Sequence, residues 1–169
     1  MIVSMVSMPE GTVTRTHVSE ARERLAASRF LLVDIELPEE GPPRRDGEQP
    51  EEEPPAGQPL AHLLGLETED VAWLGRAGKS ARAEFLGNSA AFVVPMVQEA
   101  RITHVHAFVT ERYLVTVHRG PAGPVESLTA RMPRERPPDS VAMLFLLLEE
   151  ALDTFRRSAT RALLEVEDL

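Results

Sequence analysis

The histidines are the first side chains whose spacing could support chemistry. His104 and His106 alternate within an apolar run. On a strand, both imidazoles would point to one face and could begin a metal site. If residues 111–112 form a two-residue turn, His118 falls on the opposite face and cannot complete the ligand set, although a one-residue slip in strand pairing would reverse this. Because the strand pair offers no nearby acid, we interpret these residues as ordinary sheet histidines.

Other residues that support catalysis are missing or badly spaced. The Gly-Lys-Ser string at 78–80 resembles the end of a phosphate-binding loop, but Trp73 stands where that motif requires its first glycine. Neither a cysteine nucleophile nor a Gly-x-Ser-x-Gly elbow occurs in the sequence. Glu149, Glu150 and Asp153 fall on an expected solvated helix face beside arginines, where carboxylates form weak surface pairs. We therefore predict no catalytic residues, no cofactor and no enzymatic activity.

An acidic, proline-rich segment at 37–59 interrupts the apolar pattern. It holds seven of the 14 prolines, and residues 36–53 carry eight acids against two arginines, which is −6 of the net charge of −9. Such a segment lacks the apolar area to offset its ordering entropy, so we predict a mobile surface loop. Its carboxylates could chelate a hard cation, but a solvated loop is the simpler interpretation. The negative balance argues against a nucleic-acid partner.

Length and composition indicate one ordinary domain. The chain has 169 residues, 43% of them hydrophobic, which is enough for one domain with a real core. The absence of cysteine excludes disulfide scaffolds and thiolate zinc sites. The first residues lack the basic start of a signal peptide. The longest apolar run, 141–148, is far shorter than the ~20 residues that span a bilayer, so we expect a soluble, cytosolic chain.

Periodicity and turn signals predict strands interspersed with helices. We expect strands at 2–8, 12–17, 30–35, 81–86, 91–97, 102–109 and 113–118. We expect helices at 20–27, 59–64, 67–74, 124–132 and 140–169, with Ser19 and Asp139 as N-caps of the first and last, and a proline-rich connector at 133–138. The nearly continuous apolar run at 30–35 is typical of a strand buried on both faces.

The final predicted helix carries an apolar stripe. Its members recur every three or four residues: Leu144, Leu148, Ala151, Phe155, Ala159, Ala162, Val166 and Leu169. Thirty residues make a helix about 45 Å long, which is more than a domain of this size needs. Neither Gly, Pro nor a basic last turn ends the pattern. We therefore expect the helix to continue beyond residue 169 in a longer protein.

Four strings stand in a characteristic order: FLLVDIELPEE at 30–40, LAHLLGL at 60–66, YLVTVHR at 113–119 and SVAMLFLLLEEALDTF at 140–155. This order resembles the cytoplasmic amino-terminal domain of the CorA-type divalent-metal transporter family. The resemblance implies an α/β (α+β) fold, an α/β/α sandwich on a mixed sheet, followed by the start of a long stalk helix. The domain would occupy 1–138, with the insertion at 37–59, and the truncated stalk 139–169.

The same resemblance implies a function in ion transport. The full-length protein would be a homopentamer in the cell membrane that carries Mg²⁺, or Co²⁺, Ni²⁺ or Zn²⁺, with this chain on the cytoplasmic face. The leading hypothesis is therefore a regulatory and assembly domain that self-associates through the stalk helix and the membrane domain. The alternative is a soluble protein–protein interaction module that docks a partner helix on its C-terminal apolar stripe. Neither hypothesis requires nucleic acid or a membrane span within these residues.

A regulatory metal site is also implied, with one departure. After the LGL-type segment the family places an apolar residue and then Glu-Asp, and that acid contributes to a metal site between subunits. The corresponding positions here are Ala72 and Trp73, and an indole offers no oxygen ligand to a hard cation. Glu69 and Asp70, one turn earlier, remain as weak metal-ligand candidates. Adjacent helical residues diverge by ~100°, so the two cannot face one ion from the same side.

Overall fold

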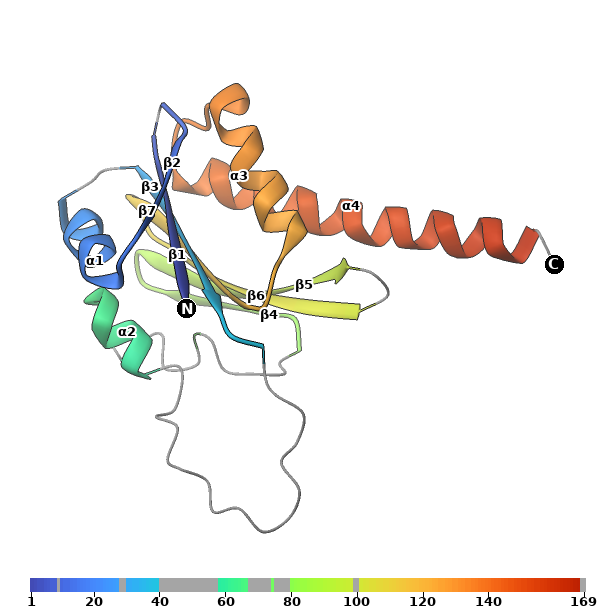
Figure 1. The fold of residues 1–169 in the computed structure, drawn as a ribbon, viewed down its shortest axis with the longest axis horizontal. Coiled ribbons are helices and arrows are strands. Elements are labelled where there is room, and N and C mark those ends of the chain that lie inside the picture. The colour runs from blue at the N-terminus through green and yellow to red at the C-terminus, as the bar shows by residue number, and fades with distance from the viewer. Residues whose placement is uncertain are drawn as a thin grey trace, which may run out of the picture.

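A seven-stranded mixed sheet forms the middle layer of the structure (Figure 1). The computed structural model describes residues 1–8, 10–27, 30–39, 58–66, 74, 80–98 and 101–167. Its strands are β1 (Ile2–Ser7), β2 (Thr12–Thr16), β3 (Leu31–Leu37), β4 (Arg82–Leu86), β5 (Ser89–Gln98), β6 (Arg101–Val109) and β7 (Tyr113–Arg119). Across the sheet they follow the order β2-β1-β3-β7-β6-β5-β4. The central pair, β3 and β7, is parallel, and the other described pairs are antiparallel.

Strand β3 lies inside the sheet, between β1 and β7. Its apolar residues are all buried, and only Asp34 and Glu36 are partly exposed. The prediction of an interior strand is confirmed, although the strand begins at Leu31 and continues to Leu37, because Phe30 lies before it and is exposed. A run that is apolar at consecutive positions can satisfy both faces of a covered sheet at once.

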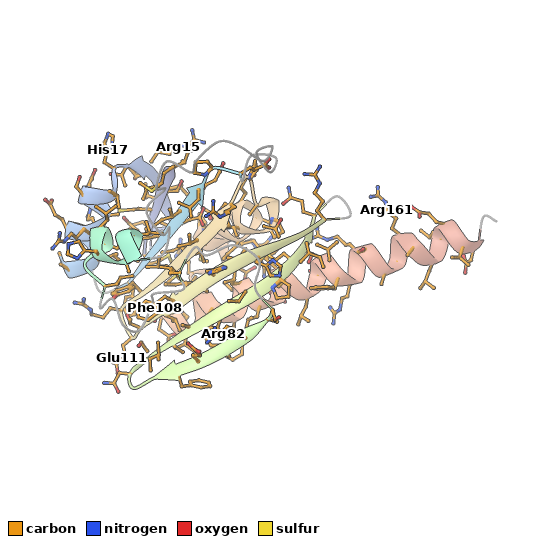
Figure 2. The ribbon with its side chains drawn as sticks, turned by 90° about the horizontal axis from the view of Figure 1, so that it is seen from below. Arg15, His17, Arg82, Phe108, Glu111 and Arg161 are labelled. Carbon is orange, nitrogen blue, oxygen red and sulfur yellow. The ribbon has the colours of Figure 1, made fainter. Side chains whose placement is uncertain are left out.

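Helices cover both faces of the sheet. Helices α1 (Val18–Ala27) and α2 (Gln58–Leu64) lie on one side, and α3 (Gly123–Glu135) and α4 (Ser140–Glu167) lie on the other. The predicted α/β/α sandwich is therefore confirmed. Figures 1 and 2 show that the second half of α4 runs out past the sheet, away from the other helices.

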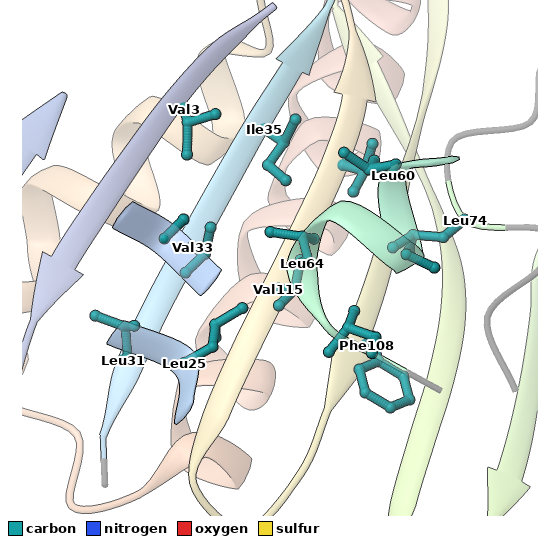
Figure 3. Close-up of a cluster of buried hydrophobic side chains, with 14 of the residues drawn as sticks. Val3, Leu25, Leu31, Val33, Ile35, Leu60, Leu64, Leu74, Phe108 and Val115 are labelled. Carbon is teal, nitrogen blue, oxygen red and sulfur yellow. The ribbon is translucent and has the colours of Figure 1, made fainter. Parts of the chain in front are cut away.

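Two apolar cores follow from this layering. In β3, Leu31, Val33 and Ile35 belong to the core under α1 and α2, whereas Leu32 belongs to the core under α3 and α4. Figure 3 shows the first core, where Leu25 of α1 and Leu64 of α2 lie over the sheet. Alternation along one buried strand thus supplies apolar side chains to both layers.

The β6–β7 hairpin has the predicted turn at 111–112. The Thr110 N–H donates to the Tyr113 carbonyl (3.0 Å), and Val109 pairs with Leu114. The Thr110 hydroxyl oxygen accepts the N–H groups of Arg112 (3.2 Å) and Tyr113 (3.3 Å). These side-chain bonds stabilise a tight turn that lacks the Gly or Asn usual in two-residue loops.

The N-cap of the last helix is as predicted, but the cap of the first is not. The Ala142 N–H donates to the Asp139 carboxylate (2.7 Å), which confirms Asp139 as the N-cap of α4. Ser19 is wrong as a cap because α1 begins one residue earlier, at Val18. The Ala21 N–H donates to the His17 carbonyl (3.1 Å), so the first helical turn closes on His17.

The prediction that α3 ends before the prolines is also wrong. The helix passes through Pro133 and ends at Glu135. Pro133 lies in the last turn, where its missing N–H removes only one bond near the end of the helix. Arg136 then adopts a left-handed conformation, and its N–H closes the helix on the Met132 carbonyl (2.9 Å). The predicted helix at 67–74 and the acidic stretch at 40–57 lie outside the described residues, except for Leu74.

Candidate functional site

Helix α4 packs through its first half on the sheet and α3, which we call, together with α1 and α2, the body. The buried residues of this half lie on one side of the helix and face β5, β7 and α3: Ser140, Met143, Leu144, Leu147, Glu150, Ala151 and Thr154. After Thr154, every residue from 155 to 167 is exposed. Among the described members of the predicted stripe, Leu144 and Ala151 are buried against the sheet, Leu148 is partly buried, and those from Phe155 onward are exposed.

Another apolar line on α4, which shares five members with the predicted stripe, is mostly uncovered. It runs along the helix at alternating intervals of four and three residues: Val141, Phe145, Leu148, Leu152, Phe155, Ala159, Ala162 and Val166. Phe145 is 68% exposed, Leu152 60% and Val166 67%, while Leu148 is half-buried. We call this set the outer line. It lies about a third of a turn from the buried face, and its spacing is that of the seam of a left-handed coiled coil.

Polar contacts fix the first half of α4 to its neighbours. Arg131 of α3 donates to the carboxylates of Glu150 (2.6 Å) and Glu149 (2.8 Å). These two bonds are the main reason that the pKa of the Arg131 guanidinium is raised. The Thr154 hydroxyl accepts the N–H of Val97 at the end of β5 (2.9 Å). The exposed half of the helix therefore leaves the body from a firmly held base.

These contacts correct the prediction for the α4 carboxylates. Glu149 and Glu150 bind Arg131 across the α3–α4 contact, and Glu150 is buried rather than solvated. Asp153 is the one of the three that makes the predicted weak pair, with Arg156 at 3.5 Å. Their chemistry is that of structural ion pairs, because all three have cationic partners within their own domain.

His104 and His106 lie on one face of the sheet and His118 lies on the other, as predicted. His106 pairs with Val117, so the next residue, His118, points the other way. Both His106 and His118 are buried, and His104 is partly exposed. Within the part of the chain that the structure describes, no three His, Asp or Glu side chains lie close enough to hold a metal ion.

His118 belongs to a polar cluster that the sequence pattern did not predict. Its Nδ1 lies 2.7 Å from the Gly120 carbonyl, and its Nε2 lies 3.3 Å from the Asp34 carboxylate. The Thr116 hydroxyl donates to the other oxygen of Asp34 (2.6 Å). The signal that could have revealed the cluster is Asp34 itself, the single acid inside the apolar run at 30–35.

The metal-ligand candidates taken from the resemblance, Glu69 and Asp70, lie outside the described residues, as do Ala72 and Trp73. The structure therefore places none of them. In the Gly-Lys-Ser string only Ser80 is described, and it is exposed.

Comparison with known proteins decides the family. A family model described as CorA-like Mg²⁺ transporter protein matches residues 48–169, which is more than half of the chain. The chain belongs to the CorA-like family. No curated protein sequence gives a significant match.

Solved structures share the fold of this CorA-like chain. The soluble domain of CorA from Methanocaldococcus jannaschii aligns with a TM-score of 0.60 and 14% identity, over 98% of this chain and 62% of that one. The ZntB cytoplasmic domain from Vibrio parahaemolyticus aligns with a TM-score of 0.60 and 9% identity, over 95% and 61%. The complete CorA magnesium transporter from Methanocaldococcus jannaschii aligns with a TM-score of 0.59 and 15% identity, over 99% and 49%.

The CorA-like chain is shorter than these structures. It spans about three-fifths of the two soluble domains and half of the complete transporter. None of the helices in its described part has the length and apolar character needed to cross a bilayer.

Proposed function

We propose that the chain is the cytoplasmic regulatory and assembly domain of a CorA-like divalent cation transporter. Membership of the family and the shared α/β/α fold support this proposal. The observation that carries it is the outer half of α4, which extends beyond the sheet with its apolar line uncovered. A helix with two apolar faces is built to bind its own body on one face and another helix on the other.

The proposed role of α4 is to connect the body to the helices of the transporter. Its first half is held by Arg131 and Thr154, so a movement of the sheet would be transmitted to the exposed half. The outer line would then pack against neighbouring helices of a homopentamer in the cell membrane. The body would contribute regulation and assembly, and the transported Mg²⁺, Co²⁺, Ni²⁺ or Zn²⁺ would be cargo rather than a resident cofactor.

Metal uptake in the host cell tests the proposal. Deletion of the gene is expected to lower uptake of at least one of these four cations, and the native gene is expected to restore it. The double variant Ala162→Asp/Val166→Asp places two charges on the outer line and is expected not to restore cation uptake. The matched variant Thr160→Asp/Leu164→Asp places two charges at the same spacing on the opposite side of the exposed helix and is expected to restore uptake. Unchanged uptake of all four cations after deletion would contradict the proposal.

A soluble interaction module that docks a partner helix is the second candidate, because the outer line fits any helix with a complementary apolar seam. The same variants separate the two functions. Under this alternative, Ala162→Asp/Val166→Asp abolishes binding of a partner protein, while deletion of the gene leaves cation uptake unchanged.

A further inference from the structure

A cleft lies where α4 leaves the body, beside the end of β5 and the start of α3. Its volume is about 560 Å³. The lining residues come from three elements: Val97 and Gln98 of β5, Gly123, Pro124 and Ser127 of α3, and Thr154, Arg157, Ser158 and Arg161 of α4. Figure 2 shows Arg161 projecting from the exposed half of α4. The cleft is therefore bounded by the body on one side and by the outgoing helix on the other.

The charge of the cleft is positive in an acidic chain. Arg157 and Arg161 contribute two guanidinium groups, none of the described residues that line the cleft is acidic, and the whole chain carries a net charge of −9. Neither arginine forms an ion pair with any acid in the described ranges. Arg157 Nε donates to the backbone carbonyl of Asp153 (3.3 Å), while the Asp153 carboxylate binds Arg156. Two like charges four residues apart repel each other along a helix, and a bound anion would remove that repulsion.

The neutral groups of the cleft suit an anionic ligand that is larger than one inorganic phosphate. Ser127 of α3 and Ser158 of α4 offer exposed hydroxyl donors, and Val97 and Pro124 supply apolar surface. The start of α3 offers no free amide, because Gly123 N–H donates to Gln98 (3.2 Å), Pro124 has none, and Val125 N–H donates to Ala122 (2.9 Å). Binding would therefore depend on side chains, and its positive charge would come from α4.

We propose that this cleft binds a phosphorylated small molecule. The planar guanidinium fork matches phosphate oxygens, and two such forks with two hydroxyls can satisfy more than one phosphate group. A volume of about 560 Å³ is in the range of small-molecule sites and leaves room for the rest of the ligand. Because the ligand would touch α3, β5 and α4 together, it would hold the exposed half of α4 at one angle to the sheet. This inference does not depend on the proposed transport function.

Calorimetric titration of the 169-residue chain tests the inference. Inorganic phosphate, pyrophosphate and ATP, all free of magnesium, are titrated at one ionic strength. We expect pyrophosphate or ATP to bind with a Kd below about 1 mM and more tightly than inorganic phosphate, since binding uses several charge-assisted contacts. A preference for ATP over pyrophosphate identifies the ligand as a nucleotide, and the reverse identifies an inorganic polyphosphate.

Variants of neighbouring arginines provide the control. Arg157→Gln/Arg161→Gln is expected to raise the Kd of the preferred probe by about tenfold or more. Arg156→Gln removes a charge from the same turn, outside the cleft, and is expected to change the Kd by less than about twofold. Circular dichroism checks that each variant is folded. Three results would each overturn the inference: no binding of any probe, equal losses in both variants, or inorganic phosphate binding as tightly as the larger probes.

Discussion

Asp34 joins two strands that lie 82 positions apart in the sequence. Its carboxylate accepts the Thr116 hydroxyl (2.6 Å) and lies 3.3 Å from His118 Nε2. On the other side of the ring, Nδ1 lies 2.7 Å from the Gly120 carbonyl, which can only accept a hydrogen bond. Nδ1 must therefore carry a proton, and a hydrogen bond from Nε2 to Asp34 requires the doubly protonated imidazolium.

The protonation of His118 is expected to make stability depend on pH. Burial lowers the pKa of His118, but the hydrogen bond and charge of Asp34, the Gly120 carbonyl and the charge of Glu36 together raise it above its ordinary value. The folded state thus binds the proton more tightly than the unfolded chain. This stabilisation is complete below about pH 6.5 and is lost as the pH rises through the higher folded pKa.

Urea denaturation between about pH 6 and pH 9 measures this effect. His118→Gln is expected to lower the free energy of unfolding by about 1–3 kcal/mol at the acidic end, because it removes a charged partner of Asp34. The same substitution should also reduce the decrease in the free energy of unfolding toward alkaline pH. His17 is exposed, so His17→Gln serves as the control and should show the same decrease in the free energy of unfolding as the wild type. A wild-type chain that grows more stable above about pH 6.5 would contradict the assignment.

Gly11 is expected to be intolerant of a side chain. Its φ is +69°, and a Cβ there would lie 2.8 Å from Pro133 of α3. Gly87 has a similar φ of +65° with nothing within 4 Å, so it isolates the conformational cost. We expect Gly87→Ala to cost about 1 kcal/mol and Gly11→Ala about 1–3 kcal/mol more, as measured by urea denaturation. Equal losses in the two variants would show that the contact with Pro133 carries no energy.

The role of a single residue could be predicted only where it depends on neighbours close in the sequence. The cap at Asp139 follows from one carboxylate and the helix that begins after it. The partners of His118 depend on the parallel pairing of β3 with β7, which places Asp34 opposite Thr116. Spacing along one segment contains no information about that pairing, so the cluster could not be derived from the sequence pattern.

At the scale of elements, Arg131 connects α3 to α4. It binds Glu150, which is buried, and Glu149, which is mostly exposed. Arg131→Ala is expected to lower the free energy of unfolding by about 1–3 kcal/mol, because it leaves the Glu150 carboxylate without its cation. Arg134→Ala breaks an exposed pair with Glu135 and is expected to cost less than about 1 kcal/mol. Thermal or urea denaturation compares the two, and equal costs would contradict the role of Glu150.

The apolar pattern of α4 shows the limit of periodicity. Leu144 and Ala151 face the core, and their neighbours Phe145 and Leu152 face outward. Both sets recur every three or four residues, so the sequence predicts the helix and its amphipathic character but cannot say which set meets the sheet. Packing against the sheet decides this, and Thr154, whose hydroxyl accepts the Val97 N–H at the end of β5, lies on the buried side.

At the scale of the whole molecule, we expect only weak binding of Mg²⁺. The positions that the resemblance assigns to a regulatory site carry Ala72 and Trp73, and Glu69 and Asp70 are adjacent acids rather than a set of ligands. The melting temperature of the chain should remain nearly constant when a few millimolar Mg²⁺ is added, because a ligand stabilises only well above its Kd. The measurement is a thermal melt against a control of matched ionic strength. A rise of several degrees that disappears in Glu69→Ala/Asp70→Ala would reveal a site.

The fold was largely predictable because each strand has a strong local signal. The apolar run of β3 and the turn at 111–112 fix an interior strand and a hairpin, and both are confirmed. The order β2-β1-β3-β7-β6-β5-β4 could not be derived, since it depends on which distant strand β3 meets. The resemblance to a family supplied the sandwich, and its residue-level expectations on Glu69 and Asp70 stay predictions.

The parallel pairing of β3 with β7 has a consequence for how the chain is made. Residues 31–37 leave the ribosome long before residues 113–119, so β2, β1 and β3 can pair while one edge of β3 has no neighbour. That edge belongs to a strand whose apolar residues are all buried in the folded sheet, and such an edge is a template for aggregation until it is covered. Closing the sheet requires a contact of long sequence separation, which slows folding. Newly synthesised chains should therefore depend on chaperones most strongly during the interval between the synthesis of these two strands.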